Sequence, residues 1–205
     1  IGQAEYDLKK TAKIISEKRK NYAEVLSSLI VEILVKLELP KCRFEIGISE
    51  TELCENGIDD VEFMISTNVS EPLKPLEKVA SGGEISRIML AIKNILAKKD
   101  SVQTLIFDEI DTGIGGEVAV AVGSHLKNLA KTRQIFCITH LASIAVYADN
   151  QIKIQKGVEG SSTQTSVFPV TGTERVKEIA RMLSGDAESE ESLEHAQAML
   201  EKFGG

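Results

Sequence analysis

Two neighbouring carboxylates, Asp108 and Glu109, directly follow a strand-like apolar run at residues 104–107. Open α/β sheets bind ligands beyond the carboxyl ends of their strands, so both side chains are expected at a ligand-binding edge. Successive residues of an extended chain point to different sides, which allows the two to do separate jobs. Asp108 could lie near a Mg²⁺ ion through water, and Glu109 could orient or deprotonate an attacking water. A solvated acidic turn that ends a strand is the simpler alternative.

A second candidate is the tetrapeptide Ser81-Gly82-Gly83-Glu84, which stands immediately before a run of helical period. Ser at the N-cap and Glu three residues later form a capping box. Two glycines in a first helical turn cost roughly 1 kcal/mol each relative to Ala, and capping does not require them. Glycines let an anion approach the backbone N–H groups, where the helix dipole favours negative charge. Taken alone, the tetrapeptide favours capping over phosphate binding.

His140 follows a second apolar run at residues 134–139, so it is expected at the same kind of strand end as the two carboxylates. A catalytic role and a structural role stay about equally open. His125 and His195 fall inside helical stretches and are interpreted as structural. Arg87 lies one turn beyond the glycine pair and faces either solvent or a phosphate.

Several common sites are missing from this sequence. It has no G-x-x-x-x-G-K-[ST] loop, so a complete phosphoryl-transfer site cannot be assembled from these residues alone. The glycines after Asp111 do not spell G-x-G-x-x-G, which excludes a dinucleotide fingerprint. Three cysteines without C-x-x-C spacing fit free thiols in a reducing cytosol rather than a zinc site; they are Cys42, Cys54 and Cys137.

The elements that must position these residues alternate along the second half of the chain. Helical periods are predicted at 85–97, 118–129 and 141–148, and apolar strands at 102–107, 134–139 and 151–155. Such alternation predicts a parallel sheet flanked by helices. Residues 163–170 could add an edge strand, and two more helices are predicted, at 173–183 with a stop at Gly185 and at 191–203.

The first half of the chain begins with a predicted amphipathic helix at residues 7–39, ended by Pro40. Its apolar residues recur every seven positions, at Leu8, Ile15, Tyr22 and Leu29, and Arg19 interrupts a second stripe at Ala12, Leu26 and Ile33. A short coiled-coil seam and a helix packed on its own domain explain this equally well. Alternation at residues 44–48 and 61–65 predicts two antiparallel strands joined by a loop around Asn56.

Composition places further bounds on function. A chain of 205 residues is most simply one domain, or one domain with an appendage. The formal net charge of −7 argues against a surface built throughout for nucleic acid, so any DNA contact must be local. No apolar run reaches membrane-spanning length. The chain begins without Met, which suggests a fragment of something longer.

In this order, S-G-G-E, L-I-F-D-E-I-D and I-T-H resemble the signature motif, the Walker B strand with its D-loop, and the switch histidine of ABC-type ATPases. The longer strings P-L-E-K-V-A-S-G-G-E-I-S-R, D-E-I-D-T-G-I-G-G and C-I-T-H-L-A-S-I-A are similar to the RecN family of bacterial DNA repair proteins, which are relatives of the SMC proteins. The resemblance covers most of the chain and is weak for the first helix. Glu84 stands where many transporter signatures carry Gln.

The resemblance implies an α/β fold, the C-terminal lobe of an ABC/SMC-type P-loop ATPase head with a long N-terminal helix. Residues 1–40 would be the stub of a returning coiled-coil arm, and residues 41–205 the C-terminal half of the head. The Walker A loop would come from the N-terminal half of the same head. This chain alone is therefore expected to hydrolyse ATP negligibly.

The resemblance also implies roles for single residues, with ATP and Mg²⁺ as cofactors. Ser81, Gly82, Gly83 and Glu84 would contact ATP held by a second head in a homodimer. Asp108 would belong to the metal site, and Glu109 and His140 would be catalytic, one activating water and the other sensing the γ-phosphate. Asp111 would cross the dimer interface.

The whole protein would act in recombinational repair of DNA double-strand breaks, in the cytoplasm and associated with the nucleoid, without a membrane partner. Its DNA-binding surface is not located by the sequence. The alternatives are the nucleotide-binding subunit of an ABC transporter and a noncatalytic dimerisation module.

Overall fold

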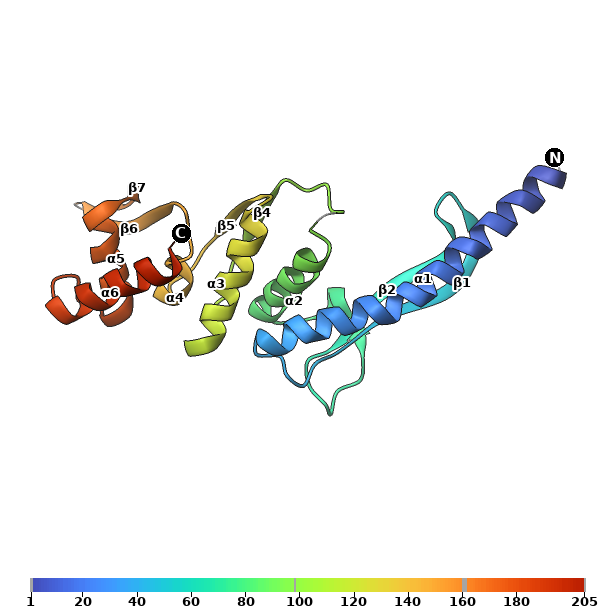
Figure 1. Cartoon of the computed structure of the whole chain (residues 1–205), viewed down its shortest axis with the longest axis horizontal. Coiled ribbons are helices and arrows are strands. Elements are labelled where there is room, and N and C mark those ends of the chain that lie inside the picture. Colours follow the sequence, from blue (N-terminus) through green and yellow to red (C-terminus); the bar gives the residue numbers. More distant parts are fainter. Residues whose placement is uncertain (1, 98, 160–161, 205) are drawn as a thin grey trace. The chain divides into compact units, whose positions relative to one another are not determined.

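The computed structural model describes residues 2–97, 99–159 and 162–204 (Figure 1). The chain divides into two compact units, residues 1–98 and residues 99–205. The signature-like tetrapeptide belongs to the first unit, and the other candidate site residues belong to the second. A functional division at residue 40 stays a prediction.

The first unit combines a long helix with an antiparallel hairpin. Its elements are α1 (Gly2–Lys36), β1 (Arg43–Cys54), β2 (Gly57–Ser66), β3 (Lys74–Pro75), the 3₁₀ turn η1 (Leu76–Lys78) and α2 (Gly82–Ile95). The predicted strand pair is confirmed, with Phe44 opposite Ile65 and Ile46 opposite Phe63. The strands are longer than predicted and run up to a tight turn, where Cys54 pairs with Gly57.

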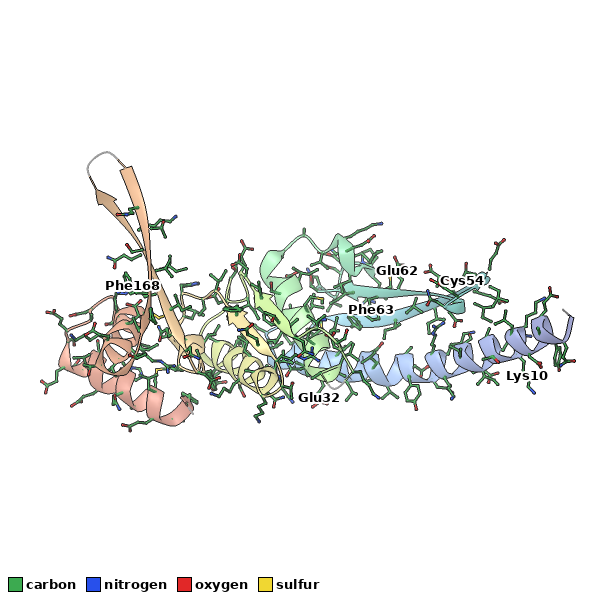
Figure 2. All side chains as sticks on the ribbon, turned by 90° about the horizontal axis from the view of Figure 1, so that it is seen from above. Lys10, Glu32, Cys54, Glu62, Phe63 and Phe168 are labelled. Atoms are coloured by element: carbon green, nitrogen blue, oxygen red, sulfur yellow. The ribbon has the colours of Figure 1, made fainter. Side chains whose placement is uncertain are left out.

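Helix α1 packs along this hairpin, which Figure 2 shows running beside it. The helix buries Ala12, Ser16, Ile30 and Leu34. The interruption by Arg19 has a structural reason, because its guanidinium lies 2.9 Å from a carboxylate oxygen of Asp59 on β2. The Ser16 hydroxyl donates to the same carboxylate at 2.6 Å. The polar break in the apolar stripe is therefore the point at which the helix is fastened to the hairpin.

The seven-residue repeat of α1 lies outside this contact. Leu8, Ile15, Tyr22 and Leu29 are all exposed, with Tyr22 at 70%. The helix thus packs on its own domain through one face, while a second apolar stripe lies along the solvent side. The two interpretations of the sequence describe different faces of one helix.

The second unit contains β4 (Thr104–Phe107), α3 (Gly116–Ala130), β5 (Gln134–Cys137), α4 (Ala142–Ala145), β6 (Gln151–Glu159), β7 (Ser162–Val170), α5 (Gly172–Ser184) and α6 (Glu190–Phe203). The α/β class is confirmed, and β4 pairs with β5 in parallel, Ile106 beside Phe136. The third predicted strand exists, but it does not join that pair. It forms an antiparallel hairpin with β7, in which Ile154 lies opposite Val167. Adjacent strands with a short connection can pair only in this direction.

Two sets of contacts hold together the helices that follow β5. The core of this unit joins α4, α5 and α6 through Ala145, Ile179 and Ala196 among others. Arg175 of α5 donates to the carbonyl of Ala148 at 2.7 Å and so ties the segment after α4 to α5. Gly185 ends α5 in the left-handed conformation, as predicted.

The parallel pair β4–β5 has two unlike faces. Phe107 is buried, and Leu105, Ile135 and Cys137 are half-buried, on the face toward α3. On the other face Ile106, Phe136 and Ile138 are exposed, Ile106 at 70%. Parallel strands are normally covered on both faces, so this apolar face is suited to covering by further protein.

Candidate functional site

Ser81 is the N-cap of α2. Its backbone is extended, and its side-chain oxygen accepts a hydrogen bond from the Glu84 N–H at 3.4 Å. The predicted N-cap role of Ser81 is therefore confirmed. Gly82 is exposed and Gly83 is buried in the first turn. Backbone N–H groups at such a turn point out of the helix, so an anion can approach them where Gly82 has no side chain.

Arg87 lies one turn beyond this cap. Its side chain is buried, so the alternative in which it faces solvent is wrong. Burial lowers the pKa of its guanidinium, and the carboxylates of Glu84 and Glu38 act against that effect. Glu38 follows α1, which packs on α2. Arg87 therefore lies near two carboxylates, one in the first turn of α2 and one just after the long helix α1.

At the end of β4, Asp108 and Glu109 are both exposed. An oxygen of Asp108 accepts a hydrogen bond from the Glu109 N–H at 2.9 Å. Glu109 has φ +56°, in the left-handed region, which costs an L-residue roughly 1–2 kcal/mol. The Glu109 carbonyl also accepts from Thr112 N–H at 3.0 Å. Strained residues of this kind cluster at functional sites. The left-handed conformation of Glu109 turns the chain directly after Asp108.

Asp111 lies inside the molecule and is 4% exposed. One of its oxygens, Oδ2, lies 2.6 Å from the Thr139 hydroxyl, 2.9 Å from the His140 N–H and 3.0 Å from His140 Nδ1. The loop after β4 is thus fastened to the segment after β5. The structure brings Asp111 and His140 together within one chain, as neighbouring ends of parallel strands lead one to expect. Whether Asp111 also reaches a second head stays a prediction.

The negative charge at this edge of the sheet affects Cys137, at the end of β5. Burial, together with the negative charges of Asp111 and Asp108, raises the pKa of its thiol to about 12. A concentration of negative charge at a strand end favours a cation, and Mg²⁺ prefers oxygen ligands of this type.

The donor set can be tested against the implied Mg²⁺ ion. Among the described residues, no three His, Cys, Asp or Glu side chains gather as a ready-made metal site. Mg²⁺ is commonly held by one or two carboxylates together with waters and nucleotide phosphates. The exposed carboxylate of Asp108 fits that incomplete kind of site and does not fit an all-protein cage.

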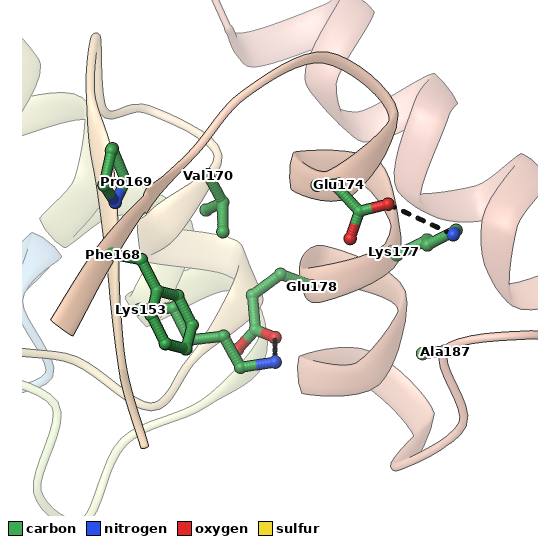
Figure 3. A pocket seen from close by; sticks show the side chains of 8 residues that line it. All are labelled: Lys153, Phe168, Pro169, Val170, Glu174, Lys177, Glu178 and Ala187. Carbon is green, nitrogen blue, oxygen red and sulfur yellow. Dashed lines mark hydrogen bonds and ion pairs between the residues drawn. The ribbon is translucent and has the colours of Figure 1, made fainter. Parts of the chain in front are cut away.

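A cavity of about 280 Å³ lies elsewhere in the second unit, between the β6–β7 hairpin and α5 (Figure 3). Its charged side chains already have partners. Lys153 lies 2.6 Å from Glu178, and Lys177 lies 3.1 Å from Glu174. Burial raises the pKa of Glu178, but hydrogen bonds from Arg181 and Lys153 outweigh burial and keep that pKa low. The charged residues that line this cavity are therefore paired, and no motif in the sequence predicts the cavity.

Two features of the site have little signal in the sequence. Thr139 lies in a predicted buried strand, yet its hydroxyl donates a hydrogen bond to Asp111. Nothing in the local pattern predicts the burial of Arg87. The Thr directly before His140 is a local signal in the sequence, because a threonine hydroxyl can donate a hydrogen bond to a carboxylate.

Among the described residues, no helix combines the length and the hydropathy that crossing a bilayer requires. No protein-family model matches the chain. A solved Smc head domain with a coiled coil and joint, from Pyrococcus yayanosii, matches 93% of this chain and 32% of its own, with a TM-score of 0.51 and 19% identity. That similarity supports the SMC-head fold.

Curated relatives give the stronger comparison. DNA repair protein RecN of Treponema pallidum is 48% identical over 193 residues, which cover 91% of this chain and 34% of the relative. RecN of Deinococcus radiodurans is 42% identical over 195 residues, covering 95% and 34%. RecN of Bacillus subtilis is 38% identical over 204 residues, covering 92% and 35%. The chain, which spans about a third of the length of these relatives, belongs to the RecN family.

Proposed function

We propose that this chain is the C-terminal part of an SMC-like ATPase head that acts in DNA repair, with ATP held between two heads. The observation that carries the proposal is the strand-end group of Asp108, Glu109 and His140, with His140 fastened by Asp111. The signature-like turn precedes it in the order that ABC-type ATPases use. The RecN relatives, named as DNA repair proteins, support the same function.

Each residue then has a distinct task. Asp108 provides a carboxylate for the metal, and Glu109, exposed at a strained turn, holds or deprotonates the attacking water. Bound MgATP supplies the phosphoryl group that is transferred. The first turn of α2, from Ser81 to Glu84, offers backbone donors to the phosphates of ATP bound by the other head. His140 meets the γ-phosphate side of the site.

We further propose that residues 1–40 are the stub of a coiled-coil arm and residues 41–205 the C-terminal half of the head. The missing half, with its Walker A loop, would cover the exposed face formed by Ile106, Phe136 and Ile138. The stripe of α1 through Leu8 and Leu29 would meet the other strand of the arm. The protein would work on DNA in the cytoplasm, at the nucleoid.

Trans-complementation of two variants in the full-length protein tests the shared site. Ser81→Arg introduces a large cation at the signature turn, and Glu109→Gln removes the catalytic carboxylate. Each variant alone is expected to be inactive. In an equal mixture, half of the dimers contain one of each, and one of the two sites in such a dimer has both native residues.

The mixture should therefore recover about a quarter of the wild-type ATPase rate, because a two-fold dimer has two equivalent sites. The matched control is a mixture of wild type with the protein that carries both substitutions, in which mixed dimers hold two half-defective sites. A mixture of the single variants with no recovery above either variant would defeat the proposal that the two motifs serve each other's sites.

A further inference from the structure

The turn after β4 holds Glu109 in a conformation that other contacts must maintain. Glu109 has φ +56°, in the left-handed region that an L-residue adopts only at a cost in energy. Its carbonyl accepts from the Thr112 N–H at 3.0 Å, which closes a turn over residues 109–112. Strained conformations of this kind persist only where the surrounding structure holds them.

The glycines that follow the turn give it little support. A Cβ built at Gly113, Gly115 or Gly116 would meet no neighbouring atom within 4 Å. The turn is instead held by its two middle residues, since Ile110 is fully buried and Asp111 is 4% exposed. Burial of an apolar side chain is non-directional, whereas hydrogen bonds depend on direction. The contacts of Asp111 are therefore the ones that can fix the orientation of the turn.

The carboxylate of Asp111 is bound to the segment that follows β5. Its Oδ2 accepts hydrogen bonds from the Thr139 hydroxyl at 2.6 Å and from the His140 backbone N–H at 2.9 Å. The Thr139 oxygen itself accepts from the Leu141 N–H at 3.0 Å, which holds the hydroxyl in place. Hydrogen bonds to a charged acceptor are stronger than neutral ones. We call this carboxylate with its two donors the Asp111 anchor.

We propose that Thr139 is a positioning residue for Glu109, and that it acts through the Asp111 anchor to keep the Glu109 backbone left-handed. Asp111 lies two residues after Glu109 in the same turn, so fixing its carboxylate to the end of β5 limits the rotation of the peptides between them. When the anchor is weakened, Glu109 can relax to a negative φ. Its side chain then leaves the native direction.

The catalytic consequence rests on the proposed function. Glu109 acts on the attacking water only when its carboxylate is within hydrogen-bond reach of that water. A misplacement of about 1 Å can cost about 100-fold in rate. Asp108 precedes the strained residue and directly follows β4, so metal and nucleotide binding depend less on the anchor. The Thr139 hydroxyl therefore affects kcat more than KM for ATP.

Nuclear magnetic resonance of this chain, without nucleotide, tests the conformational part. A positive φ brings an amide proton close to its own α proton, so Glu109 should give a strong intraresidue nuclear Overhauser effect. Thr139→Val should weaken this signal, and Thr139→Ser, which keeps the hydroxyl, should retain it. Thr132→Val is the matched control, because it removes a hydroxyl hydrogen bond to the Leu129 carbonyl in the same unit. A weak signal in the native chain, or a native signal in folded Thr139→Val, would overturn the proposal.

Urea unfolding provides a second measure of the same coupling. If the anchor imposes the strain, its loss is partly offset when Glu109 relaxes. Thr139→Val should therefore lower the urea midpoint less in the native chain than in Glu109→Gly, where the glycine leaves no strain to relieve. Equal shifts of the midpoint in the two backgrounds would contradict the proposal.

Kinetics of the full-length protein test the catalytic part. Thr139→Val should lower kcat by about tenfold to a hundredfold, with little change in KM for ATP. Thr139→Ser and the control Thr132→Val should both keep kcat close to the native value. A native kcat in Thr139→Val would overturn the catalytic role of the anchor. If the native full-length protein hydrolyses no ATP, the proposed function fails instead, and the resonance and urea measurements still decide whether the anchor holds Glu109.

Discussion

Replacing Gly123 by Ala tests the packing that places the Asp111 loop against the His140 segment. Gly123 lies in α3, which follows that loop, and its neighbour Tyr147 lies just after α4, which follows His140. A Cβ at Gly123 would overlap Tyr147 Cδ2 and lie 2.8 Å from Cε2. The Tyr147 ring cannot withdraw freely, because its centroid lies 5.1 Å from that of Phe203 in α6.

Two opposing effects determine the sign of the change in stability. Ala is favoured over Gly in a helix interior by about 1 kcal/mol. Overpacking of a filled interior costs about 1–3 kcal/mol, and a contact this short belongs at the upper end of that range. We therefore expect Gly123→Ala to lower the free energy of unfolding by about 1–2 kcal/mol.

Urea unfolding of Gly123→Ala, Tyr147→Leu and the double variant measures this coupling. In the Tyr147→Leu background the ring is gone, so Gly123→Ala should be neutral or stabilise by up to about 1 kcal/mol through helix propensity. If Gly123→Ala alone raised the free energy of unfolding above that of the native chain, the packing argument would be refuted.

Three further predictions concern backbone strain, pH and thiol reactivity. Glu109→Gly should be about 0.5–1 kcal/mol more stable to urea than Glu109→Gln. Gly removes the strain of the positive φ, and that gain exceeds the extra conformational entropy that Gly loses on folding. Equal stabilities of the two variants would exclude strain at this residue. The Ser16 hydroxyl, and secondarily Arg19, holds the pKa of Asp59 below its usual 3.8, so this stabilisation is complete above that pH and is lost as pH falls through the lower folded value. Urea unfolding at several pH values should therefore show a shallower acid loss for Asp59→Asn, and parallel curves would count against the contact. Iodoacetamide at pH 8 should modify exposed Cys54 first, since burial raises the pKa of Cys42 and Cys137; rapid labelling of a Cys54→Ser chain would contradict this.

Local patterns in the sequence predicted most of the elements. The N-cap at Ser81, the stop at Gly185 and the alternation around Phe44 are all features that neighbouring residues decide. The order of the three motifs also identified the family. The sequence alone therefore predicts both strand ends that carry candidate site residues.

Contacts between distant residues could not be predicted in the same way. The partner of β6 depends on which strand is available, and its apolar residues fit a parallel sheet and a hairpin equally well. The nearness of Arg87 to Glu38 depends on the packing of α2 against α1, and the positive φ of Glu109 has no signature in the sequence. The two hydrogen-bond donors to Asp111 come from residues 28 and 29 positions away.

We propose above all that this chain carries the catalytic carboxylate of an ATPase head. Nucleotide trapping by the full-length protein tests it most directly, with Glu109→Gln compared against the native protein by size-exclusion chromatography and radiolabelled ATP. The account predicts that Glu109→Gln binds ATP, accumulates ATP-bound dimers and loses hydrolysis, because the water-activating group alone is removed. Hydrolysis at the native rate in Glu109→Gln would contradict the account.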